Sequence, residues 1–259
     1  MFKKKILAIG VIIASVLFFL LVLKSMGLLE ESVVLTNRQK NILMEQGLPT
    51  DYDELSFSKQ VEIEAIENML KYLEKKYKSK FEYKDYTPNG AFNEERLEAI
   101  SADRKDLGII CVTREAKNGK WVYEDDYDEL LMAEKYKKEL FKFLDKQIPG
   151  KEAKCVIYTD ISKYDSKKKD IVASSSAQNR IGIKGISVER FKYLIKKYDN
   201  WMSEKELQYS TSTFFVLLKE KEFNNVSDSV ISDYIHDNKY VKCVEWYYDL
   251  DEKTIEEWK

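Results

Sequence analysis

The chain has 259 residues, of which 34% are charged, and its 43 basic and 45 acidic side chains give a net charge of −2 at pH 7. This balance excludes a strongly basic nucleic-acid-binding protein, so no nucleic-acid partner is expected. The 17 Tyr, 12 Phe and 4 Trp residues exclude a disordered chain and predict a folded domain with a sizeable core.

The first predicted element is an uncharged, apolar stretch between Lys5 and Lys24. Its roughly 18 residues are near the lower limit for a helix that crosses the hydrocarbon core of a bilayer. No polar face recurs at helical spacing, which disfavours the alternative of a buried helix in a globular core. We therefore predict a transmembrane signal anchor over residues 6–29, with the lipid bilayer as a partner.

The orientation of this anchor follows from the charges that flank it. Three lysines, residues 3–5, precede the apolar stretch, whereas Lys24 is followed closely by Glu30 and Glu31. Under the positive-inside rule, residues 1–5 are cytoplasmic and the C-terminal domain is extracytoplasmic. A cleaved signal peptide is the alternative, although no A-x-A-like cleavage site follows the stretch. Both interpretations place the domain outside the cytoplasm.

A connecting segment, residues 30–56, and a first α+β unit, residues 57–160, are expected next. The connecting segment contains a short helical pattern that stops at Gly47. The first unit begins with an amphipathic helix, because apolar residues recur every three or four positions between residues 58 and 77. These apolar residues are Ile63, Ile66, Leu70, Leu73 and Tyr77.

The rest of the first unit alternates strands with a second long helix. "KFEYKDY" alternates as a half-buried strand does, and Asn118-Gly119 predicts a tight hairpin within "LGIICVTREAKNGKWVYE". A helix is expected over residues 127–147, with Met132, Tyr136, Leu140, Phe143 and Leu144 on its inner face. "AKCVIYTDI" is a further strand.

Residues 161–186 show no clear periodicity and are expected to be a loop or linker before a second α+β unit, residues 187–259. This unit contains helices near residues 188–198 and 227–236, each followed by a strand. The predicted fold class is α+β, with a mixed or mostly antiparallel sheet and amphipathic helices packed on one of its faces. The phrase DYDEL occurs at residues 51–55 and again at 126–130, which leaves a duplication open.

The cysteine, histidine and serine residues do not occur in the sequence patterns of known catalytic or metal-binding sites. Cys111, Cys155 and Cys243 each lie in an apolar run, which favours buried strand residues without a functional disulfide. His236 is the only histidine and no cysteine pair has metal-ligand spacing, so no metal site is expected. The serines at residues 174–176 lack a nucleophile-elbow motif, and no glycine-rich phosphate loop is present. We predict no catalytic residues and no cofactor.

The C-terminal segment "CVEWYYDLDEKTIEEWK" combines aromatic and acidic residues. Trp and Tyr are enriched in the hot spots of protein interfaces, so this segment is the predicted protein contact. Alternation along a strand places residues 244, 246 and 248 on one face and residues 243, 245 and 247 on the other. The candidate contact residues are Trp246, Tyr247, Tyr248 and Trp258.

Residues 42–83, "ILMEQGLPTDYDELSFSKQVEIEAIENMLKYLEKKYKSKFEY", resemble the N-terminal part of uncharacterised membrane-anchored or lipoprotein-type proteins of low-GC Gram-positive bacteria. The resemblance implies export and supplies no catalytic residues. The hypothesis is a single-pass extracytoplasmic protein-binding module, for example an immunity or accessory factor for an exported toxin or envelope system. The alternatives are a carboxylate-dependent envelope hydrolase and a sensory or structural ectodomain.

Overall fold

The computed structural model describes residues 33–88, 94–148, 154–219, 221, 226–227, 231–237, 240–249 and 252–258. Its architecture is α+β with two sheets, which confirms the predicted class and the mostly antiparallel pairing. Within these ranges, no helix is both long and apolar enough to cross a membrane. The predicted anchor, residues 6–29, lies outside the described residues.

The chain divides into two compact units, and the boundary after Tyr72 falls inside helix α3. The first unit contains α2 (Asn37–Glu45), the 3₁₀ turn η1 (Tyr52–Glu54) and most of α3 (Phe57–Tyr77). A capping box starts α2, because the Thr36 hydroxyl accepts from the Gln39 N–H and the Gln39 side chain accepts from the Thr36 N–H. Gly47, with φ of +69°, follows the helix as predicted.

The second unit begins with a four-stranded antiparallel sheet in the order β1-β2-β3-β4. Asn118 and Gly119 have φ of +52° and +73° and join β3 to β4, which confirms the predicted hairpin. The second strand was not predicted from the sequence. The elements are β1 (Phe81–Thr87), β2 (Glu94–Ser101), η2 (Lys105–Leu107), β3 (Ile110–Lys117) and β4 (Lys120–Asp125).

An ion pair is buried on the apolar face of this sheet. Arg114 and Glu95 are 4% and 5% exposed and pair directly across β3 and β2. The Tyr86 hydroxyl donates to the same Glu95 oxygen at 2.8 Å, and the Arg114 guanidinium lies 4.1 Å from the centre of the Trp121 ring. The apolar part of this face consists of Phe81, Leu97, Ala99, Ile110 and Val112.

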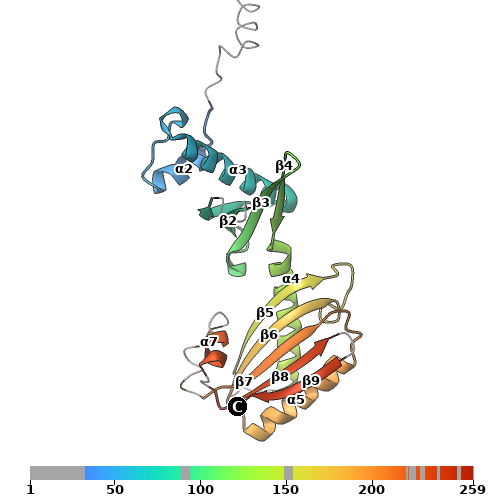
Figure 1. Cartoon of the computed structure of the whole chain (residues 1–259). Coiled ribbons are helices and arrows are strands. Elements are labelled where there is room, and N and C mark those ends of the chain that lie inside the picture. Colours follow the sequence, from blue (N-terminus) through green and yellow to red (C-terminus); the bar gives the residue numbers. More distant parts are fainter. Residues whose placement is uncertain are drawn as a thin grey trace, which may run out of the picture. The chain divides into compact units, whose positions relative to one another are not determined.

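The rest of the second unit is a five-stranded sheet in the order β5-β6-β7-β8-β9 (Figure 1). Only β6 and β7 are parallel, and helix α5 supplies the crossover between them. The elements are α4 (Tyr127–Gln147), β5 (Lys154–Tyr164), β6 (Ser175–Lys184), α5 (Val188–Ser203), β7 (Thr211–Leu217), α7 (Ile231–His236), β8 (Lys242–Asp249) and β9 (Glu252–Trp258).

Helices α4 and α5 cover one face of the five-stranded sheet and run behind it in Figure 1. Their apolar residues pack on the inner faces of all the strands from β5 to β8. A polar layer crosses this core: the Asn179 amide donates to the Thr213 hydroxyl at 3.1 Å, and that hydroxyl lies 2.8 Å from the Tyr198 hydroxyl. These buried bonds fix the orientation of α5 on the sheet.

Helix α7 packs on the opposite face, where Ile231 joins Val216, Leu218 and Cys243 in a second cluster. Gly182 permits this contact, since a Cβ atom there would lie 2.9 Å from Ile231 Cδ1. The five-stranded sheet therefore carries helices on both faces, and the expectation of one covered face was wrong. The short length of α7 hid its apolar face from a periodicity argument.

The structure also differs from the sequence-based expectation for residues 161–186 and for the two DYDEL copies. Residues 161–186, expected to be a loop or linker, contain the end of β5, a connection and β6. Polar inward residues such as Asn179, which bonds within the core, obscured the alternation of β6. The two DYDEL copies differ as well, because residues 51–55 form a 3₁₀ turn and residues 126–130 open α4.

Candidate functional site

A groove lies between α4 and α5 in the second unit. Phe143 on α4 and Trp201 on α5 stack at its centre, with ring centroids 4.7 Å apart and an angle of 19° between the planes. Tyr198 contacts both rings from the core side, at 5.7 Å from each. Because Tyr198 fills the core beneath it, the Trp201 indole stays half-buried at the seam between the helices.

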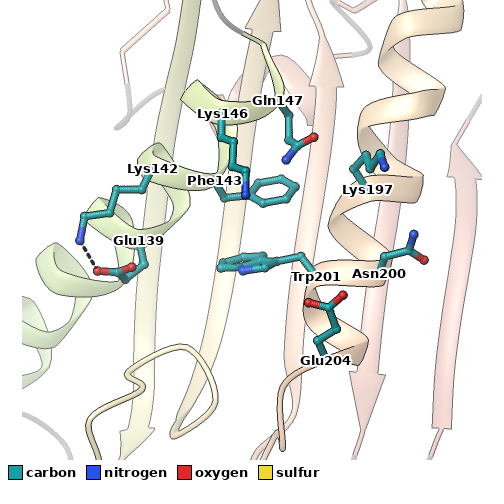
Figure 2. A pocket seen from close by; sticks show the side chains of 9 residues that line it. All are labelled: Glu139, Lys142, Phe143, Lys146, Gln147, Lys197, Asn200, Trp201 and Glu204. Carbon is teal, nitrogen blue, oxygen red and sulfur yellow. Dashed lines mark hydrogen bonds and ion pairs between the residues drawn. The ribbon is translucent and has the colours of Figure 1, made fainter.

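A cavity of about 390 Å³ opens beside this aromatic pair. Figure 2 shows Lys146 of α4 next to the Phe143 ring and Lys197 of α5 on the opposite wall. Lys142 is held by Glu139 at 2.6 Å, one turn away on the same helix. The lining residues are Glu139, Lys142, Phe143, Lys146, Gln147, Lys197, Asn200, Trp201 and Glu204.

A second cavity, of about 460 Å³, adjoins the first, because Trp201 and Glu204 line both. It reaches the connection between β5 and β6, where Lys168 and Lys169 lie. A third, of about 310 Å³, shares Glu139 with the first and Lys169 with the second. We call these three adjoining cavities the lysine groove.

Lys205 and Asp170 form an ion pair in the lysine groove. The Lys205 ammonium lies 2.5 Å from Asp170 Oδ2 and 4.8 Å from the centre of the Trp201 ring. Burial acts to raise the pKa of Asp170, but the bonds from Lys205 and from the N–H groups of Val172 and Ala173 outweigh it and lower that pKa. Asp170 is therefore ionised at neutral pH and holds the lysine against the indole.

The lysine groove carries an excess of positive charge. Lys146, Lys168 and Lys169 form no ion pair with any residue that the structure describes. Six lysines line the groove and only four carboxylates, two of which are already paired with Lys142 and Lys205. The lysines are Lys142, Lys146, Lys168, Lys169, Lys197 and Lys205, and the carboxylates are Glu139, Asp170, Glu204 and Glu206.

The acidic start of α4 lies apart from this groove and has a structural role. Asp125 accepts bonds from the Tyr77 hydroxyl at 2.6 Å and from Lys76 at 2.9 Å, and Asp126 accepts from the Cys111 N–H at 2.8 Å. Burial, and then the bond to Asp125, raises the pKa of Tyr77. Among the described residues, no group of three or more His, Cys, Asp or Glu side chains could hold a metal ion.

One carboxylate oxygen in this cluster, Glu129 Oε2, is buried and has no hydrogen-bond partner among the described residues. Burial raises the pKa of Glu129, and the neighbouring carboxylates raise it further. This group destabilises the folded state when it is ionised.

The four predicted contact residues do not form one surface. Trp246 is 1% exposed and its indole N–H donates to Asp199 at 3.0 Å inside the core, so its assignment as a contact residue was wrong. Tyr248 is partly buried on the same inner face, whereas Tyr247 lies on the other face of β8. The predicted alternation along the strand is therefore confirmed. The side chain of Trp258 lies outside the described residues.

The other chemistry-bearing residues are peripheral or buried. His236 ends α7 with its side chain 92% exposed, 3.7 Å from Asp237. Cys111, Cys155 and Cys243 lie in β3, β5 and β8 as expected, and burial raises the pKa of each thiol. The serines at residues 174 and 175 are buried.

Comparisons with known proteins assign no activity. A model of a family described as "Protein of unknown function (DUF1493)" matches residues 29–124, a span that includes the stretch 42–83 discussed above. No curated protein matches the chain. A crystal structure of a DUF5037 family protein from Ruminococcus gnavus is 12% identical, with a TM-score of 0.47 over 74% of this chain and 94% of the other. The chain is thus similar, over part of its length, to a family of unknown function.

Proposed function

We propose that this chain is a single-pass membrane protein whose extracytoplasmic α+β domain binds a protein partner in the lysine groove. The observation that carries the proposal is the half-buried Trp201 indole, stacked on the buried Phe143 ring at the centre of a concave surface. Tryptophan at the centre of a concave patch is typical of the residues that dominate binding energy. The apolar residues 6–29 and the lysines before them support the membrane location.

The same geometry favours binding over the alternative of a carboxylate-dependent hydrolase. Such an enzyme needs two carboxylates facing one scissile bond, one of them free to act as an acid. In the lysine groove, two of the four carboxylates, Glu139 and Asp170, are each paired with a lysine, at 2.6 and 2.5 Å, and the other two, Glu204 and Glu206, are exposed to solvent. The bonds that Asp170 accepts lower its pKa, so this carboxyl is a poor proton donor. We therefore propose that the domain is not an enzyme.

Site-specific photocrosslinking in the native cells tests the binding site. A photoreactive residue at Asn200, an exposed position in the lysine groove, is expected to give a discrete protein adduct that Trp201→Ala removes. The matched control is Gln178, an exposed position on the other face of the sheet, which should give none. Equal adducts from both positions, or no adduct from Asn200, would refute the binding site.

The topology has a separate test. Alkaline phosphatase fused after Lys259 folds only outside the cytoplasm and is expected to be active, whereas a fusion at the same position to a fluorescent protein that matures only in the cytoplasm should be dark. The reverse pattern would refute the extracytoplasmic location. An immunity or accessory role is a narrower form of the same proposal, and a toxin gene directly beside this one would favour it over the other roles.

A further inference from the structure

The lysine groove is more basic than the chain that contains it. The whole chain has a net charge of −2, yet lysines that form no ion pair with any described residue line both walls and one end of the groove; of these, the Lys197 ammonium lies 5.2 Å from the centre of the Tyr193 ring. Lys146 is on the α4 wall, Lys197 is on the α5 wall, and Lys168 and Lys169 lie at the end formed by the β5–β6 connection. Like charges that converge on a concave surface repel one another unless a negative ligand lies between them.

The arrangement fits an elongated ligand rather than a single ion. Along α4, the groove runs from Glu139 to Lys146, which corresponds to roughly 10 Å at the rise of an α-helix. An extended peptide covers that length with about three residues. The Phe143–Trp201 pair lies within this span, so an apolar side chain of such a peptide would rest on the rings while its neighbours face the lysines.

The groove also contains acceptors for a peptide backbone. Glu204 and Glu206 are exposed and form no ion pair with described residues, and Gln147 and Asn200 offer amide groups nearby. A peptide supplies N–H donors for these carboxylates. A polyphosphate chain supplies only negative oxygens, which the two glutamates would repel.

From this geometry we infer that the lysine groove binds an acidic segment of the partner protein, with an apolar residue on the Phe143–Trp201 pair and carboxylates against Lys146 and Lys197. The inference rests on the proposed protein-binding function and adds the chemistry of the bound segment. Part of the attraction is electrostatic, so binding is expected to weaken as the salt concentration rises.

Calorimetric titration of the full-length protein in neutral detergent tests this inference. The probe is the peptide acetyl-Glu-Glu-Phe-Glu-Glu-amide, with the Gln-Gln-Phe-Gln-Gln and Lys-Lys-Phe-Lys-Lys peptides for comparison. The acidic peptide should bind most tightly, and the double variant Lys146→Glu/Lys197→Glu should weaken it roughly tenfold. The matched control is Lys84→Glu/Lys120→Glu, the same charge change at exposed positions of the four-stranded sheet, and should change the affinity less than twofold.

Each other outcome has a defined meaning. Equal binding of the three peptides, or equal weakening in both double variants, would overturn the inference. Tighter binding of inorganic polyphosphate or of vesicles containing phosphatidylglycerol would overturn it in favour of a phosphate ligand. If the Asn200 crosslink survives the Lys146→Glu/Lys197→Glu change, the acidic segment is refuted while the protein-binding function stands. Denaturation curves of both double variants show whether each is folded.

Discussion

Replacing Trp246 by alanine is expected to destabilise the second unit rather than to impair binding directly. The side chain is 1% exposed and its ring lies 5.4 Å from Tyr198, edge to face, in the main core. Truncation of a buried tryptophan to alanine costs about 3–5 kcal/mol through lost burial and the cavity that remains. Its indole N–H also donates to Asp199. Without the indole, the Asp199 carboxylate still has the Lys253 ammonium at 2.9 Å and remains 20% exposed to solvent, so loss of this bond adds little to the cost.

The assay is guanidinium denaturation of the full-length protein, followed by far-ultraviolet circular dichroism because the substitution removes a fluorophore. Tyr247→Ala is the matched control, since this neighbour lies on the opposite face of β8 and is only partly buried. It should cost about 1 kcal/mol or less. A cost below about 1 kcal/mol for Trp246→Ala, with lower affinity for the partner, would show that Trp246 is a contact residue and that the core assignment is wrong.

Four further predictions concern stability and reactivity. Glu95→Ala should lower the free energy of unfolding by about 3–5 kcal/mol in chemical denaturation, because it leaves Arg114 buried without a counter-charge. The double variant Glu95→Leu/Arg114→Met should recover most of that loss. Gly182→Ala should cost roughly 1–3 kcal/mol by the same measurement, since the added Cβ meets Ile231. Burial raises the pKa of the Cys243 thiol to about 12, so iodoacetamide at pH 8 should label it only after denaturation, as read by mass spectrometry. Glu129→Gln should stabilise the fold by about 1 kcal/mol at neutral pH, because the raised pKa of Glu129 means that ionisation opposes folding. That gain should shrink in denaturation curves as the pH falls through the raised pKa, and should disappear below the ordinary glutamate value of 4.5, where the carboxyl is neutral in both states.

The helices were the most predictable part of the fold. The bounds expected for α4 agree with the structure because its apolar residues repeat at helical spacing and acidic residues mark its start. The turn at Asn118-Gly119 was predictable because both residues adopt positive φ at low cost. In these segments, local conformational preference and tertiary packing favour the same structure, so the sequence pattern is sufficient.

Three strands were missed where tertiary contacts override local preference. In β2, the charged residue Glu95 occupies a buried, inward position. The sequence "EERLEAIS" is also rich in helix-favouring residues, so the alternation of buried and exposed positions is hard to recognise. In β6, Asn179 occupies an inward position because its partners come from β5 and β7. In β9, charged residues fill an edge strand, which is typical of strands that avoid pairing with other molecules.

The lysine groove could not be predicted because its parts are distant in the sequence. Phe143 and Trp201 meet only after α4 and α5 pack side by side on the sheet, and the buried hydroxyl of Tyr198 sets the rotation of α5 that brings Trp201 to the seam. Loss of the Tyr198–Thr213 bond would free that rotation and shift the indole, although neither residue lines the groove. The binding surface is therefore a product of core packing, and a core variant that preserves folding can still alter it.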